Sequence, residues 1–209
     1  MTNNSKDSLL IIFTRNPELG KCKTRLAATT GDESALEIYK FLLQHTVSIS
    51  EDLEVDKQVH YSVKVRENDI WNPSVYTKKQ QQGEDLGARM NHAFKQAFDE
   101  GYKRVIIIGS DMFDLSQQDI ELAFKELGDH NFVIGPAEDG GYYLFGMKSL
   151  NSSVFLNKKW GTDTVLAETL EDLKTENIKQ LEVRNDVDYY EDIKDIEAFK
   201  KFLPKHLIK

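Results

Sequence analysis

Two short runs of consecutive apolar residues are the clearest feature of the hydrophobic pattern. They are LLIIFT at Leu9–Thr14 and RVIIIG at Arg104–Gly109. Strands that are apolar at consecutive positions are typical of parallel sheets with helices on both faces, because both sides of each strand are then buried. The two runs therefore predict two strands of such a sheet.

The rest of the chain has the periodicity of helices and shorter strands. Ser116 and Asp119 have the spacing of a capping box, which predicts the start of one helix. Helical spacing of apolar residues predicts four more, at Asp32 to about Ser50, Leu86 to about Glu100, Asp163 to about Lys174, and Tyr189–Phe202. Alternation predicts a half-buried strand at Val59–Val65, and short strands are expected at Val75–Lys78, Phe132–Gly135 and Tyr142–Gly146.

The order of these elements predicts the fold class. Strands alternate with helices along the chain, which is typical of an α/β protein with a mostly parallel sheet. In such sheets, ligands bind beyond the carboxyl ends of the strands. The candidate site therefore lies in the loops Arg15–Leu26 and Ser110–Leu115, with Pro136–Gly141 as a third segment.

Composition narrows the class of protein. The 209 residues predict a single domain over 1–209, and a hydrophobic fraction of 40% is enough for a buried core. A formal net charge of −8 argues against nucleic acid as a partner. No apolar run is long enough to span a membrane, and the start MTNNSKDS lacks the apolar stretch of a signal peptide, so we expect a cytoplasmic protein. One cysteine excludes a disulfide within the chain.

A group of cations follows the first strand. Lys21, Lys23 and Arg25 stand beside the start of a helix near Thr24, and Arg15 adds a fourth charge. Cations at a helix start can hold phosphate oxygens. The alternative is a solvated basic turn, but the position at the carboxyl end of a strand favours a phosphate site.

Carboxylates follow the second apolar strand. Asp111 emerges at the expected sheet edge, where a carboxylate can hold Mg²⁺ or Mn²⁺. Asp114 has the position of a helix cap or loop anchor, and a capping role for Asp111 is the alternative.

Three further segments carry candidate chemistry. Glu138 and Asp139 could bind a metal, accept hydrogen bonds from sugar hydroxyls or supply a base, and Gly140 and Gly141 would let the backbone approach a ligand closely. The alternative is an ordinary hairpin turn. Helix capping explains the acids of Gly83–Arg89, although Arg89 could reach a phosphate. Trp160, near Thr162, could form a stacking wall or belong to the core. The acids of Asn185–Asp188 could bind metal with Asp111 or cap the following segment.

Five motifs in order resemble one family. FTRNPELGKCKTRL resembles the family signature K-x-P-x-P-G-x-x-K-T-R-L, and GEDLGARM, IIIGSD, GPAEDGGYYL and WGTDTVL follow it. The chain is similar to bacterial glycosyltransferase-like proteins, also called radical-SAM/selenodomain-associated transferases. These resemble phospholactate guanylyltransferases and, more distantly, nucleotide-sugar transferases with the GT-A fold. The family usually has proline at position 113, where this chain has Phe113.

The resemblance implies a three-layer α/β/α sandwich of the Rossmann-like GT-A type. It implies a nucleoside triphosphate or nucleotide-sugar ligand and a divalent metal, Mg²⁺ or Mn²⁺. By position, the resemblance places Lys23 and Arg25 on phosphates and Asp139 in the acceptor region. Together with the loops described above, the residues expected to serve the nucleotide are Arg15, Lys21, Lys23, Arg25, Gly83 and Arg89. Those expected to serve the acceptor are Glu138, Asp139, Gly140, Gly141, Trp160 and Thr162. Asp111, Asp139 and Lys23 would be catalytic, and Asp111 and Asp188 would hold the metal, with Asp186 the alternative to Asp188.

The function expected from these observations is transfer from a nucleotide-activated donor to a small-molecule acceptor. A metal with Lys and Arg stabilises the negative charge that builds on the leaving phosphate oxygens. In one version a phosphorylated acceptor attacks the α-phosphate of a triphosphate, and in the other a hydroxyl attacks the anomeric carbon of a nucleotide sugar. The alternative is a nucleotide-binding regulatory module without turnover.

Overall fold

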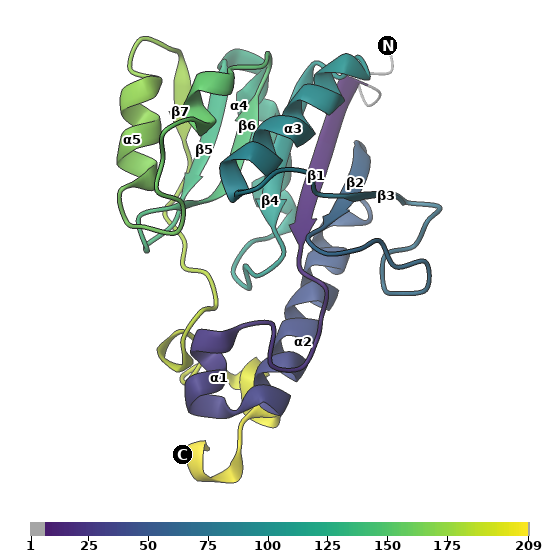
Figure 1. Cartoon of the computed structure of the whole chain (residues 1–209), viewed down its shortest axis with the longest axis vertical. Helices are drawn as coiled ribbons and strands as arrows, with labels where there is room; N and C mark the ends of the chain where they lie inside the picture. Colours follow the sequence, from purple (N-terminus) through teal and green to yellow (C-terminus); the bar gives the residue numbers. More distant parts are fainter. Residues whose placement is uncertain (1–6, 209) are drawn as a thin grey trace.

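The fold is a seven-stranded sheet covered by helices on both faces (Figure 1). The computed structural model describes residues 7–208. The strand order is β3-β2-β1-β4-β6-β5-β7, and β6 runs antiparallel to its two neighbours while the other strand pairs are parallel. The strands are β1 (Ser8–Thr14), β2 (Asp56–Tyr61), β3 (Tyr76–Gln80), β4 (Arg104–Gly109), β5 (Phe132–Pro136), β6 (Tyr142–Met147) and β7 (Ile178–Gln180). The expected α/β class with a mostly parallel sheet is confirmed.

The helices complete the layers. The α-helices are α1 (Thr24–Thr30), α2 (Asp32–Ser50), α3 (Leu86–Asp99), α4 (Gln117–Asp129) and α5 (Val165–Asp172). The 3₁₀ helices are η2 (Ser152–Phe155), η3 (Tyr190–Asp192), η4 (Glu197–Phe202) and η5 (Lys205–Leu207). In the described chain no helix is both long and apolar enough to cross a membrane. Residues 1–6, which carry most of the sequence used for the signal-peptide expectation, lie outside the described range.

Alternation along β1 divides the core into two halves. Leu10 and Ile12 pack with residues of α2 and α4, whereas Leu9 and Ile11 pack with residues of α3. Successive side chains of a strand point to opposite faces, so a strand between two helical layers must be apolar at every position. This explains the unbroken runs in β1 and β4.

A third hydrophobic cluster lies beyond the carboxyl ends of the strands. It joins Leu26 of α1 and Ile38 of α2 to the C-terminal residues Val187, Ile193 and Phe199. Figure 1 shows this lower group, with α1 and the yellow C-terminal segment beneath the end of β1. The cluster holds the C-terminal segment against the loops that follow β1 and β4.

The strand predicted at Val59–Val65 is wrong in its bounds. β2 spans Asp56–Tyr61, and five of its six residues are buried, so its residues do not alternate between buried and exposed. Beyond it, the side-chain oxygen of Asn16 accepts hydrogen bonds from the backbone N–H groups of Val63 and Lys64, at 3.1 and 3.2 Å. Asn16 therefore takes the donors that a longer strand would have given to the sheet.

The helix predicted at Tyr189–Phe202 is also wrong. The segment forms η3 and η4, which are separated by residues 193–196 with Ile196 extended. Its apolar residues Tyr190, Ile193, Ile196 and Phe199 recur every three positions. This repeat matches the three residues per turn of a 3₁₀ helix better than the 3.6 of an α-helix, in keeping with short 3₁₀ helices in this segment. The other elements agree with expectation to within a few residues, although α5 is shorter than Asp163–Lys174 and β7 was not predicted.

We predict that Phe199→Ala destabilises the protein by about 3–5 kcal/mol, the usual cost of removing a fully buried aromatic ring. Phe199 is fully buried and packs on Phe113, with ring centroids 4.7 Å apart. Phe202→Ala is the matched control, because Phe202 is only partly buried in the same cluster. Urea unfolding measures both, and equal losses for the two variants would contradict the central role of Phe199.

Candidate functional site

The site begins at the topological switch point of the sheet. β1 pairs with β2 on one side and with β4 on the other, so the loops after β1 and β4 leave the same edge in adjacent positions. A crevice between such loops is the usual ligand site of an open parallel sheet. The loops expected from the sequence are therefore the ones that the topology brings together.

Tyr39 of α2 anchors the loop after β1. Its hydroxyl accepts a hydrogen bond from the backbone N–H of Arg15 at 2.9 Å and donates one to the Arg15 carbonyl at 3.1 Å. The same hydroxyl lies 3.3 Å from the Ser110 hydroxyl, at the start of the loop after β4. One buried phenol thus ties both loops together, a role that the sequence pattern did not reveal.

Lys23 lies at the centre of the site. Its ammonium donates to the carboxylate of Asp111 at 2.8 Å and to that of Asp188 at 2.9 Å, and its side chain is only 6% exposed. Burial alone would lower its pKa, but the two carboxylates outweigh that effect and the pKa of Lys23 is raised. Lys23 therefore stays positively charged, and it joins loops that come from both ends of the chain.

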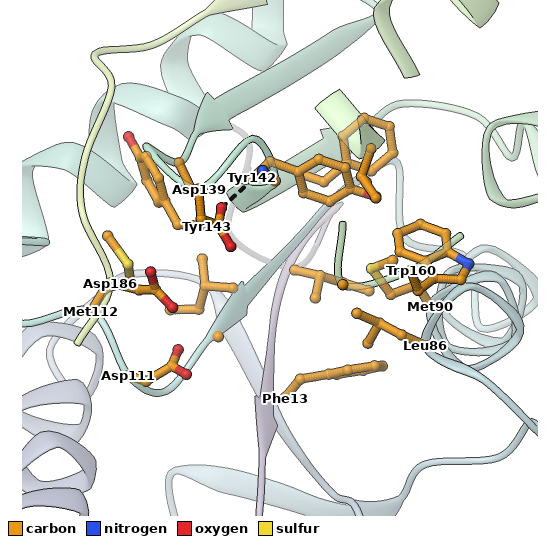
Figure 2. Close-up of a pocket in the computed structure, with 18 of the residues that line it drawn as sticks. Phe13, Leu86, Met90, Asp111, Met112, Asp139, Tyr142, Tyr143, Trp160 and Asp186 are labelled. Carbon is orange, nitrogen blue, oxygen red and sulfur yellow. Dashed lines mark hydrogen bonds between the residues drawn. The ribbon is translucent and has the colours of Figure 1, made fainter. Parts of the chain in front are cut away.

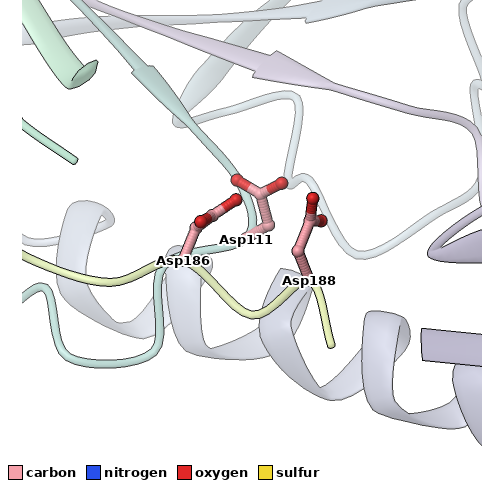
Figure 3. A group of neighbouring side chains, drawn as sticks. All are labelled: Asp111, Asp186 and Asp188. Atoms are coloured by element: carbon pink, nitrogen blue, oxygen red, sulfur yellow. The ribbon is translucent and has the colours of Figure 1, made fainter. Parts of the chain in front are cut away.

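Three carboxylates form one cluster at this point. Asp111, Asp186 and Asp188 each offer an oxygen, and these oxygens all lie within 4.8 Å of one another. Figure 3 shows the side chains of Asp186 and Asp188, on the C-terminal segment, beside that of Asp111. The backbone N–H of Val187 donates to the Asp111 carbonyl at 3.3 Å, and the buried Val187 side chain belongs to the third hydrophobic cluster. The two acids of the DVD sequence thus flank an apolar anchor.

A different acid caps the C-terminal segment. Asp192 accepts hydrogen bonds from the backbone N–H groups of Asp188 and Tyr189 at 2.9 and 2.6 Å, and from the Asn185 amide at 2.8 Å. Asp192 therefore has the capping role that the sequence left open for Asp188. The Asp188 carboxylate binds Lys23 and also accepts from Arg25 at 2.9 Å. Ser116, not Asp111 or Asp114, caps α4.

The charges of the cluster differ in their electrostatic surroundings. Burial and the neighbouring carboxylates of Asp111 and Asp188 raise the pKa of Asp186 to about 6. Burial acts in the same direction on Asp188, but Lys23 and Arg25 outweigh it and its pKa is lowered. The cluster therefore has more negative charge than Lys23 alone compensates, and a divalent cation would relieve the excess.

One cavity beside the cluster is rich in cations. It has a volume of about 610 Å³ and is lined by Arg15, Lys23, Arg25 and Arg89, among others. Lys21, expected in the same group, instead pairs with Glu18 at 2.9 Å, is mostly exposed and does not line this cavity.

Gly83 supports this cavity indirectly. Its carbonyl accepts a hydrogen bond from the Arg89 Nε at 3.0 Å, and its φ of +140° suits glycine. A Cβ at this position would also collide with the start of α3. Gly83 thus positions Arg89 at the helix start and does not itself line the cavity.

A second cavity, of about 220 Å³, lies on the other side of Asp111 (Figure 2). Its wall contains the carboxylates of Asp111, Asp139 and Asp186 at one end. At the other end Figure 2 shows an apolar group of Phe13, Leu86, Met90 and Trp160. The two cavities share Phe13, Leu86, Gly109 and Asp111. Asp111 thus stands between them.

The GPAEDGG segment forms the turn between β5 and β6. Asp139 accepts a hydrogen bond from the Gly141 N–H at 2.8 Å, and both residues line the second cavity. Gly140 has a φ of +86° and packs against the backbone of Asp163, where a Cβ would collide. Glu138 is exposed and does not line this cavity. The turn and the site are therefore one structure, and it carries Asp139 into the cavity.

Trp160 closes the apolar end of the second cavity. Its indole packs on Gly87 of α3 so closely that a Cβ there would collide with it. Tyr142 meets it edge-on, with centroids 6.4 Å apart. Thr162 lines the same cavity and donates to the Lys159 carbonyl at 2.7 Å. Trp160 therefore combines the two roles that the sequence left open, because it forms a wall of the cavity and also packs against its neighbours in the core.

The comparisons with known proteins agree with the fold. The family model described as "Uncharacterized protein conserved in bacteria (DUF2064)" matches residues 42–162. A structure from Desulfovibrio desulfuricans G20, provisionally described as a nucleotide-diphospho-sugar transferase, is 32% identical, with a TM-score of 0.83 over 94% of this chain and 91% of that one. The 4-diphosphocytidyl-2C-methyl-D-erythritol synthase of Anaerococcus prevotii is 11% identical, with a TM-score of 0.60 over 95% and 97% of the two chains, and shares the fold.

A curated relative is the 2-phospho-L-lactate guanylyltransferase of Methanocaldococcus fervens. It is 28% identical over 134 residues, which are 64% of this chain and 59% of the relative. The match therefore spans less than two thirds of that protein's length.

We predict that Asp186→Asn stabilises the metal-free protein at pH 8 by about 1 kcal/mol after solvent screening. The pKa of Asp186 rises from 3.8 to about 6 on folding, so ionisation of Asp186 disfavours the folded state above that range. The carboxyl is protonated in both states only well below pH 3.8, so the stabilisation should shrink as the pH falls and be clearly smaller at pH 4 than at pH 8. Urea unfolding at pH 4 and pH 8 in EDTA tests this. An equal effect at the two pH values would show that the stabilisation does not come from the ionisation of Asp186.

Proposed function

Because this chain belongs to the bacterial family DUF2064, we propose that it is a metal-dependent transferase that uses a nucleotide-activated donor and a small-molecule acceptor. The observation that carries the proposal is the position of Asp111, on the wall shared by a cation-rich cavity and a second cavity. A transferase must bring a donor and an acceptor together at one point, and this arrangement provides such a point.

The cation-rich cavity is assigned to the donor. Arg15, Arg25 and Arg89 line it, and Arg side chains bind phosphate oxygens through two N–H groups at once. Similarity to proteins described as a guanylyltransferase and as a nucleotide-diphospho-sugar transferase supports a nucleotide as the donor. Lys21 has no place in this assignment, because it pairs with Glu18 instead.

The carboxylate cluster fits a divalent metal. Three carboxylate oxygens within 4.8 Å of one another are hard oxygen ligands of the type that Mg²⁺ and Mn²⁺ prefer. Asp111, Asp186 and Asp188 would hold the ion, so both acids of the DVD sequence are assigned to it. The metal would supply positive charge next to the phosphate oxygens of the donor.

Lys23 has two roles in this proposal. In the metal-free protein its ammonium neutralises Asp111 and Asp188. Since Lys23 also lines the donor cavity, the same ammonium can bind a phosphate oxygen when a metal takes over the carboxylates. The charge that pairs with the carboxylates is then the charge that stabilises the leaving phosphate.

We predict that Asp111→Asn abolishes metal-dependent nucleotide binding without unfolding the protein. A thermal-shift screen of nucleoside triphosphates and nucleotide sugars, with and without Mg²⁺ or Mn²⁺, identifies the donor, because a ligand of the folded state raises Tm. Asp114→Asn is the matched control, since Asp114 is in the same loop but lines neither cavity. Retention of a metal-dependent shift in Asp111→Asn would reject the metal assignment.

We predict that Lys23→Met has opposite effects on the affinity for Mn²⁺ and on the affinity for nucleotide. Free Mn²⁺ should bind more tightly, because a competing cation has been removed from Asp111 and Asp188. The metal-loaded variant should bind nucleotide more weakly by about 1.5–3 kcal/mol, the range for a hydrogen bond to a charged group. Calorimetry with Mn²⁺ alone and then with nucleotide measures both, and Lys21→Met is the control. Weaker Mn²⁺ binding in Lys23→Met would contradict the proposal that the Lys23 ammonium and the metal compete for the same carboxylates.

A further inference from the structure

The two cavities differ sharply in charge. The donor cavity is lined by four Lys and Arg side chains, Arg15, Lys23, Arg25 and Arg89. Among the residues that the structure describes, no Lys, Arg or His lines the second cavity, whereas three aspartates do. Asp111 and Asp186 would be neutralised by a metal, but the charge of Asp139 remains.

This difference restricts the ligands that the second cavity can hold. A phosphate or carboxylate group requires Lys, Arg or a comparable donor when it leaves water, because its desolvation is otherwise uncompensated. Next to Asp139 it would also meet a like charge. An uncharged hydroxyl, by contrast, is favoured next to Asp139, because it can donate a hydrogen bond to the carboxylate.

The shape of the cavity adds a second requirement. The end opposite the carboxylates is formed by Phe13, Leu86, Met90 and Trp160, with Tyr142 edge-on to the indole. Figure 2 shows the polar and apolar ends facing each other across the cavity. Such a site favours a molecule that has hydroxyl groups at one end and a ring or hydrocarbon portion at the other.

We infer that the acceptor is an alcohol without an anionic group, with an apolar ring or chain that packs against Trp160. The inference rests on the proposed function and names the substrate class of its second cavity. It separates this chain from its Methanocaldococcus relative, whose name contains a phosphorylated compound, 2-phospho-L-lactate.

An uncharged alcohol acceptor favours glycosyl transfer over nucleotidyl transfer to a phosphate. The acceptor oxygen forms a bond to the anomeric carbon of a nucleotide sugar, and the bond from that carbon to the phosphate oxygen breaks. The electron pair of the broken bond leaves with the nucleoside diphosphate. The hydroxyl proton passes to the carboxylate of Asp139, which lines the acceptor cavity.

The two tryptophans of the chain allow a direct test. Trp71 is 2% exposed in the core, so changes in Trp fluorescence on ligand addition report Trp160. The probes are benzyl alcohol, benzylamine and benzyl phosphate, which share one ring and differ in charge. Inorganic pyrophosphate and Mg²⁺ are added first to fill the donor cavity, and Trp160→Phe gives the background signal.

The expected result is that benzyl alcohol and benzylamine change the Trp160 signal, with benzyl phosphate weaker by about tenfold or more because of charge repulsion. Leu86→Lys should reduce this discrimination, since Leu86 lines the cavity and is 45% exposed, so a lysine there can reach the ligand without unfolding the protein. Leu122→Lys is the matched control, on α4 and 43% exposed but outside both cavities.

Tighter binding of benzyl phosphate, or no response to any of the three probes, would overturn the inference. A separate calorimetric titration of pyrophosphate with Mg²⁺ tests the donor cavity alone. Failure of that titration would count against the proposed function, whereas the probe series can still be measured without pyrophosphate. The two failures are therefore distinguishable.

Discussion

The ion pairs of the Lys23 ammonium with Asp111 and Asp188 are the interaction on which the site depends. A buried cation requires polar or charged partners, and carboxylates this close together require a cation or a proton between them. The two requirements are satisfied by the same contacts, at 2.8 and 2.9 Å. Lys23 adopts a left-handed backbone conformation at the start of α1, with φ 47° and ψ 47°, which costs of order 1 kcal/mol in a non-glycine residue. The ion pairs offset that cost.

The packing around this interaction explains why it is specific. The third hydrophobic cluster fixes the C-terminal segment through Val187, and Asp192 holds its backbone, so Asp188 is held where its carboxylate pairs with both Lys23 and Arg25. Tyr39 holds the loop after β1 against the loop after β4. Val187, Asp192 and Tyr39 thus hold the segments that carry Asp188, Arg15 and Ser110, and this part of the candidate site is fixed by the fold itself.

Much of the fold and part of the site follow from local sequence pattern. The runs in β1 and β4 are unambiguous because burial on both faces demands apolar residues at every position. The bounds of β2 depend on Asn16, which is far away in sequence and captures two backbone donors, so no local pattern reveals them. The C-terminal spacing of three did contain the signal for 3₁₀ geometry, but it also resembles an imperfect helical repeat.

For the site residues too, the sequence predicts one part and the fold decides the rest. Their motifs mark the loops, but motif position does not distinguish Lys21 from Lys23, because the left-handed turn at Lys23 and the pairing of Lys21 with Glu18 decide which ammonium is buried. The choice between Asp186 and Asp188 likewise depends on the fold of the C-terminal segment. The structure brings both beside Asp111, where Asp188 pairs with Lys23 and Arg25 and Asp186 lines the second cavity.

The pairing of Lys23 with Asp188 joins residues 165 positions apart, which has a consequence for biosynthesis. Chains are made from the amino end, and early segments can fold while later ones are still being added. The central strands and the cations after β1 are complete long before the segment with Asp186 and Asp188 leaves the ribosome. Until then Lys23 lacks one of its two carboxylate partners, and the carboxylate cluster does not exist. A nascent chain that has the central strands but not yet residues 186–188 therefore lacks two of the three carboxylates of the candidate site.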